Sequence, residues 1–121
     1  MVNKSKAKGT AFETWVLAHL RRALPHFVAE RLPLVGNLDQ GDLVIVDGVG
    51  NRSYVLEAKA VQRMDLPSHL AEAKAEAENY AAVRGKDPLT VFGVVVLKRR
   101  RAPVGGSYVI MDLDTFVRMV D

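Results

Sequence analysis

The sequence predicts an α/β protein in which a mixed β-sheet is flanked by helices. Two segments, at about residues 10–24 and 68–84, carry apolar residues at the spacing of a helix that covers a core. Between and after them lie short runs of β-branched and aromatic residues, which are typical of strands. The predicted order is α-β-β-β-α-β-β-α, and a chain of 121 residues has the usual length of a single domain.

The first helix is expected from about Thr10 to Leu24, because Pro25 cannot continue it. Residues 1–9 are expected to be a basic flexible arm, which leaves 10–121 as the folded domain. Thr10 and Glu13 have the spacing of a capping box. Glu13 also falls inside the apolar arc of this helix, where a carboxylate costs free energy unless it is paired. It is therefore interpreted as a helix cap, a metal ligand or both.

A short strand is expected at residues 30–35, followed by a hairpin that joins strands at 42–46 and 54–59. The connecting segment, residues 47–52, is rich in turn-forming residues. If this loop is symmetric about residues 49 and 50, Asp42 lies directly opposite Glu57. Lys59 would share their face, since side chains alternate along a strand.

The second helix is expected from Ser68, as N-cap, to Arg84, with Gly85 as the stop. Its alanines predict close packing against the sheet. Its exposed face is expected to hold four charged residues: Glu72, Lys74, Glu76 and Glu78.

The remaining elements are two strands and a closing helix. Residues 89–97 predict a strand that is covered on both faces, because the run is apolar without alternation. A last strand is expected at 107–111. Asp112 would then cap a short helix whose inward residues are Phe116, Val117 and Val120.

Composition excludes several classes of site. The chain has no cysteine, so disulfides, thiolate zinc sites and cysteine nucleophiles are excluded. Its longest apolar run, residues 91–97, is far shorter than the roughly 18 residues of a membrane span, and we expect a cytoplasmic protein. The formal net charge is only +3, but basic residues cluster near the start and at residues 98–101. Such clusters favour an anionic partner, although solvated loops would look the same.

The predicted hairpin suggests a metal site. Two carboxylates as close as Asp42 and Glu57 repel each other unless a cation lies between them, and oxygen ligands suit Mg²⁺ or Mn²⁺. Asp39 could replace Asp42 as the ligand. Taken singly, Asp42 could instead bind backbone N–H groups at the start of a strand, and Glu57 with Lys59 could be an exposed ion pair.

The pattern Gly41-Asp42, then Glu57-Ala58-Lys59, with Glu13 on a preceding helix, resembles the PD-(D/E)XK nuclease superfamily. Within it the chain is similar to the small Holliday junction resolvases of archaea and of actinobacterial phages. The segments that carry this likeness are residues 8–13, 94–100 and 107–111. Gly41 departs from the motif, which has proline there. The helical Gln-x-x-x-Tyr signature is only echoed, by Glu76 and Tyr80.

The resemblance implies a restriction-endonuclease-like core and a Mg²⁺-dependent DNA endonuclease, in which Mn²⁺ can substitute. Asp42, Glu57 and the Ala58 carbonyl would hold the metal, with Glu13 contributing directly or through water. Lys59 would orient the attacking water, and the products would carry a 5′-phosphate and a 3′-hydroxyl.

The substrate implied is branched or double-stranded DNA, most readily a four-way junction cut by a homodimer. A nuclease of ordinary duplex and a non-catalytic DNA-binding protein with this fold are the alternatives. The expected phosphate contacts are basic residues of the arm and of two loops: Lys4, Lys6, Lys8, Arg63, Lys98, Arg99, Arg100 and Arg101.

Overall fold

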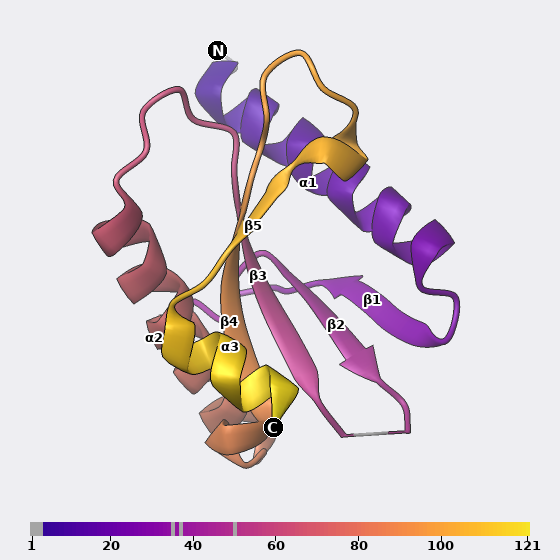
Figure 1. Ribbon diagram of the computed structural model, residues 1–121, viewed down its shortest axis with the longest axis vertical. Helices are drawn as coiled ribbons and strands as arrows, with labels where there is room; N and C mark the ends of the chain where they lie inside the picture. Colours follow the sequence, from indigo (N-terminus) through magenta and orange to yellow (C-terminus); the bar gives the residue numbers. More distant parts are fainter. Residues whose placement is uncertain (1–3, 35, 37, 50) are drawn as a thin grey trace.

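The computed structural model describes residues 4–34, 36, 38–49 and 51–121, with side chains from Gly9 onward, and shows a five-stranded sheet between helices (Figure 1). The strands lie in the order β1-β2-β3-β4-β5; β3 and β4 are parallel, and the other neighbours are antiparallel. The elements are α1 (Lys4–Ala23), β1 (Phe27–Arg31), β2 (Leu43–Asp47), β3 (Ser53–Lys59), α2 (Leu66–Arg84), η1 (Pro88–Thr90), β4 (Val91–Leu97), η2 (Val104–Gly106), β5 (Tyr108–Ile110) and α3 (Leu113–Val120). This order confirms the predicted α-β-β-β-α-β-β-α arrangement.

The two long helices cover opposite faces of the sheet. Phe12 and Val16 of α1 pack in one buried cluster with Leu56 of β3. Ala77 and Tyr80 of α2 pack in a second cluster with Val55, the neighbouring residue of the same strand. All seven residues of β4 are buried, as the unbroken apolar run predicts for a strand covered on both faces.

The alanines of α2 allow the helix to approach the sheet closely. A Cβ atom added to Gly93 of β4 would lie 2.3 Å from the backbone oxygen of Ala73 and 3.1 Å from Cβ of Ala77. Only a glycine in the strand and small residues on the helix fit this contact. It places the inner face of α2 directly over β3 and β4.

The first helix is longer than the sequence predicts. It begins at Lys4, so residues 4–9, expected as a flexible arm, form its first turns. Thr10 consequently lies inside the helix, where its carbonyl accepts a bond of 3.0 Å from the Thr14 hydroxyl. The predicted capping box is therefore wrong, because a residue inside the helix has no free N-terminal N–H groups to satisfy. The first strand is also shifted, to Phe27–Arg31 from the expected 30–35.

The second helix begins two residues before the predicted cap. Asp65 is its N-cap and accepts a bond from the N–H of Ser68, which lies in the first turn. Gly85 ends the helix in the left-handed conformation, with φ of 63°, as predicted.

The closing helix has the predicted cap but the opposite orientation. Asp112 accepts a 2.8 Å hydrogen bond from the N–H of Thr115. Thr115 is the buried residue of α3, whereas Phe116, Val117 and Val120 are 51, 55 and 70% exposed. The prediction that these three face inward is wrong, because the helix contacts the sheet along the other side, where the Arg118 guanidinium lies 4.8 Å from the centre of the Phe92 ring. No helix of the described ranges is both long and apolar enough to cross a membrane.

Candidate active site

The hairpin has the predicted register, and it brings Asp42 close enough to Glu57 for their charges to interact. Leu43 pairs with Leu56 and Val44 with Val55, which is the register that symmetry about residues 49 and 50 predicts; the regular pairing ends at Leu43. Two hydrogen bonds hold Asp42, the residue before β2, against β3. The N–H of Asp42 donates to the carbonyl of Leu56 over 3.1 Å, and the N–H of Ala58 donates to Oδ2 of Asp42 over 2.8 Å.

Glu57 and Lys59 project from the face of the sheet that α2 covers. They alternate with residues of the α1 face and share the side of Val44 and Val55, which pack against α2. Asp42, bonded to the N–H of Ala58 between them, completes the group of three side chains that sequence reasoning selected.

Lys59 lies between two carboxylates of different elements. Its Nζ is 3.2 Å from Oε1 of Glu57 and 3.2 Å from Oε2 of Glu72 on α2. Burial lowers the pKa of Lys59, but Glu57 and Glu72 outweigh that effect and the net pKa is raised. The ammonium group thus remains charged, beside the paired acids.

Asp42 and the second carboxylate oxygen of Glu57 have no cationic partner among the described residues. Burial, and next the charge of Glu57, raise the pKa of Asp42 to about 7, while the Ala58 N–H acts in the opposite direction. Glu57 is 5% exposed, and within the described residues its Oε2 has no hydrogen-bond partner. A buried carboxylate oxygen without a donor is the environment that a bound cation would satisfy.

Three oxygen donors in this corner suit a divalent cation. Asp42 and Glu57 supply carboxylates. The carbonyl of Ala58 faces the same side of β3 as its N–H, which points to Asp42. Hard oxygen ligands of this kind suit Mg²⁺ or Mn²⁺.

Glu13 approaches from α1 and is held by an ion pair rather than by a helix cap. Its Oε1 lies 3.1 Å from a guanidinium nitrogen of Arg31 on β1. Burial raises the pKa of Glu13, Arg31 lowers it, and the charge of Glu57 raises it further. Glu13 in turn raises the pKa of Asp42, so its charge acts on the Asp42–Glu57 pair.

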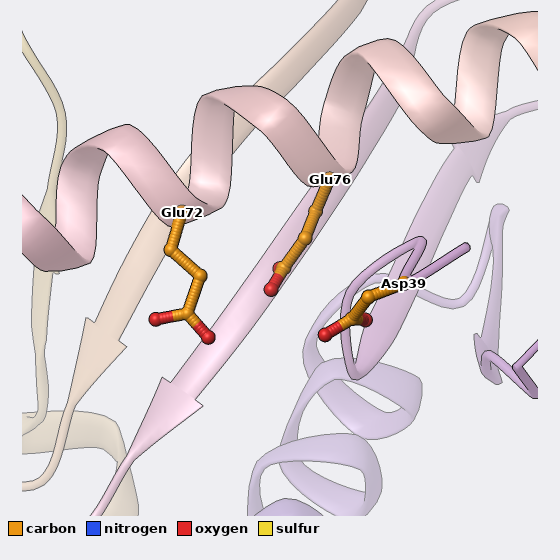
Figure 2. A group of neighbouring side chains, drawn as sticks. All are labelled: Asp39, Glu72 and Glu76. Carbon is orange, nitrogen blue, oxygen red and sulfur yellow. The ribbon is translucent and has the colours of Figure 1, made fainter. Parts of the chain in front are cut away.

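The structure adds three acids that the sequence reasoning did not place in one cluster. Asp39, Glu72 and Glu76 each offer a carboxylate oxygen within 4.8 Å of the others (Figure 2). Glu76 was expected on the exposed face of α2 but is 2% exposed. Its spacing from Ala73 and Tyr80, three and four residues away, was the available signal, because such neighbours share one helix face.

The backbone conformation of Gly41 explains why proline cannot stand at this position. Its φ of +100° excludes proline, whose ring fixes φ near −65°, and strains any residue with a Cβ. An added Cβ would lie 2.6 Å from Cγ1 of Val55 and 3.3 Å from Oε2 of Glu76. Glycine therefore lets the loop pass between β3 and α2, with Asp39 and Asp42 on either side of the turn.

The predicted basic contacts lie partly within the described structure. Arg63 is exposed in the segment after β3, and residues 98–101 are exposed after β4. Because β3 and β4 are parallel, both segments leave the sheet at the edge where Glu57 and Lys59 lie. Lys98 also stacks its Nζ 5.1 Å from the centre of the Trp15 ring on α1. The side chains of Lys4, Lys6 and Lys8 lie outside the described residues.

Comparison with solved structures supports the fold. The chain is similar to Hjc, a Holliday junction resolvase from the archaeal hyperthermophile Archaeoglobus fulgidus, with a TM-score of 0.53 and 24% sequence identity. The match covers 90% of this chain and 92% of the resolvase chain. The chain thus has a restriction-endonuclease-like fold of mixed α+β type. No family model and no curated protein matches the sequence.

Proposed function

We propose that this protein is a Mg²⁺-dependent, structure-selective DNA endonuclease of the Holliday junction resolvase type. The observation that carries the proposal is the proximity of Asp42, Glu57 and Lys59, at the end of the sheet where two basic segments leave it. The likeness in fold to an archaeal resolvase supports the same interpretation.

In this proposal Asp42, Glu57 and the carbonyl of Ala58 hold the metal, and Glu13 contributes directly or through water. A bound Mg²⁺ would lower the pKa of a water ligand and neutralise charge on the scissile phosphate. Lys59, kept charged by Glu57 and Glu72, would orient the water and stabilise the negative charge of the transition state. Hydrolysis would leave a 5′-phosphate and a 3′-hydroxyl.

The basic residues would set how the DNA binds. Arg63 and residues 98–101 are exposed on segments beside the acids, where they can contact phosphates on either side of the scissile bond. Phosphate contacts read the path of the backbone rather than the base sequence, which suits a branched substrate. We propose that two copies of the chain act together, because a four-way junction needs two symmetric cuts.

The test incubates the purified protein with a labelled four-way junction and with a duplex of the same sequence, in Mg²⁺ and in chelator. We expect paired, symmetric nicks in the junction, with Mg²⁺ only. Equal cutting of the duplex would instead indicate a nuclease of ordinary DNA, and binding without cutting would indicate a DNA-binding protein.

Substitutions at Glu57 and Lys59 test the catalytic roles proposed for these residues. Glu57→Gln and Lys59→Ala should each abolish cutting while junction binding survives. Two exposed positions on α2 provide matched controls, Glu78→Gln and Lys74→Gln, and both should cut as the wild type does. Near-wild-type cutting by either site variant would contradict the proposed mechanism. Light scattering should give twice the 13.3 kDa mass of one chain.

A further inference from the structure

The acids around the candidate site outnumber the cations that the structure pairs with them. Glu57 and Glu72 share Lys59, and Glu13 pairs with Arg31, each through the ion pairs described above. Against these two cations stand six carboxylates: Glu13, Asp39, Asp42, Glu57, Glu72 and Glu76.

Glu76 is the least compensated of these acids. It projects from α2 toward Asp39 and lies beside Glu72, one helical turn away (Figure 2). The side chain is 2% exposed, and neither carboxylate oxygen has a hydrogen-bond partner among the described residues. Burying an unpaired carboxylate costs several kcal/mol in most settings, so such a group requires a cation or a proton.

The loop that carries Asp39 is built to face Glu76. Oδ1 of Asp39 accepts a 2.9 Å bond from the N–H of Gly41, and its backbone carbonyl accepts a 2.8 Å bond from Asn79 of α2. Gly41 leaves the space that Oε2 of Glu76 occupies. These contacts fix Asp39 against the helix while its second carboxylate oxygen stays available to a ligand.

We infer that Asp39, Glu72 and Glu76 form a second divalent-cation site, next to the Asp42–Glu57 pair. Lys59 contacts both groups of acids, and Glu76 also lies against Glu57, so the two groups adjoin each other. Three carboxylates without a nitrogen or sulfur donor again suit Mg²⁺ or Mn²⁺. The existence of this site follows from the geometry alone; its use rests on the proposed function, in which a second ion would stabilise the leaving oxygen.

The test counts Mn²⁺ ions bound per folded chain, without DNA, from the electron paramagnetic resonance signal of the free ion. We expect two ions for the wild type and for the exposed control Glu78→Gln. Glu72→Gln/Glu76→Gln should bind one, and Asp42→Asn should also bind one. A single ion in the wild type, or two ions in the double variant, would overturn the inference.

A separate measurement checks that the Glu72→Gln/Glu76→Gln variant is folded. In chelator the double variant should stay folded, because Glu76→Gln removes an acid that the wild type buries without a partner and Glu72 is half-exposed. If it does not fold, Asp39→Asn in the exposed loop serves instead, and should weaken one of the two sites about tenfold or more. Unchanged binding at both sites would also overturn the inference. Two bound ions without junction cutting would contradict the proposed function alone, and cutting with one ion would contradict the second site alone.

Discussion

The backbone N–H of Ala58 donates a 2.8 Å hydrogen bond to Oδ2 of Asp42. This bond ties a carboxylate that precedes β2 to the strand that carries Glu57 and Lys59. It uses one carboxylate oxygen and keeps the two acids close, although their charges repel. The stability of this corner should therefore depend on what neutralises Asp42.

Without metal, the protein should lose stability as the pH rises. Burial and the charge of Glu57 raise the pKa of Asp42 from 3.8 to about 7, so the folded chain binds this proton more tightly than the unfolded chain. Its contribution is complete below about pH 4 and is lost as the pH rises to about 7, at a cost of about 2–4 kcal/mol. Denaturant unfolding in chelator at about pH 5 and pH 8 measures this difference.

Asp42→Asn should reduce that pH dependence, and the exposed Asp114→Asn should not. Mg²⁺ should restore the stability of the wild type at the higher pH, because it binds the ionised form. A wild type in chelator that gains stability across this range would contradict the environment assigned to Asp42.

Gly41→Ala should destabilise the fold by about 2–4 kcal/mol. Alanine would keep the strained φ of +100° and would bring its Cβ within 2.6 Å of Val55. Denaturant unfolding measures the loss. Gly48→Ala in the hairpin is the matched control, because its Cβ would meet nothing within 4 Å, and it should stay within about 0.5 kcal/mol of the wild type. Equal stability of the two variants would show that the loop before Asp42 can rearrange.

The sequence allowed the hairpin register to be predicted because turn residues between two apolar runs leave few ways to pair them. The proximity of Asp42 to Glu57 then followed from that register, although the regular pairing ends one residue earlier, at Leu43. The strand β4 could be predicted equally well, because an unbroken apolar run indicates a strand that is covered on both faces.

The errors arose where local patterns compete with packing. Thr10 and Glu13 have the spacing of a capping box, but α1 begins earlier, at Lys4. Glu13 instead forms an ion pair with Arg31. Glu76 looks like a surface residue by charge, yet its helical position places it between Ala73 and Tyr80. In α3, apolar character suggested the inward side, whereas Thr115 is the residue that packs. In each case tertiary packing overrode residue type.

Neutralising the basic run after β4 should flatten the salt dependence of junction binding. Arg99, Arg100 and Arg101 are exposed, so each can bind one phosphate. Removing one such arginine–phosphate pair should lower the slope of log affinity against log salt by about 0.9, or about 3 for the triple glutamine variant. Fluorescence anisotropy in chelator gives the slope without cleavage.

Arg84→Gln is the control for this measurement. Arg84 ends α2, on the side of the sheet where β4 begins, and its guanidinium stacks 5.4 Å from the Tyr80 ring. It should leave the slope unchanged. An unaltered slope in the triple variant would place the DNA on another surface.

Two single variants, Glu13→Gln and Arg31→Gln, distinguish a metal-binding role of Glu13 from a structural role. The ion pair between these residues is half-exposed, and its loss alone should cost only about 1 kcal/mol or less. If Glu13 contributes to the metal, Glu13→Gln should slow junction cutting at least about tenfold and weaken Mn²⁺ binding, whereas Arg31→Gln should do neither. Cutting rates under single-turnover conditions and Mn²⁺ titration measure the two effects. Equal losses of cutting rate and Mn²⁺ binding in both variants would show that Glu13 acts only as the ion-pair partner of Arg31.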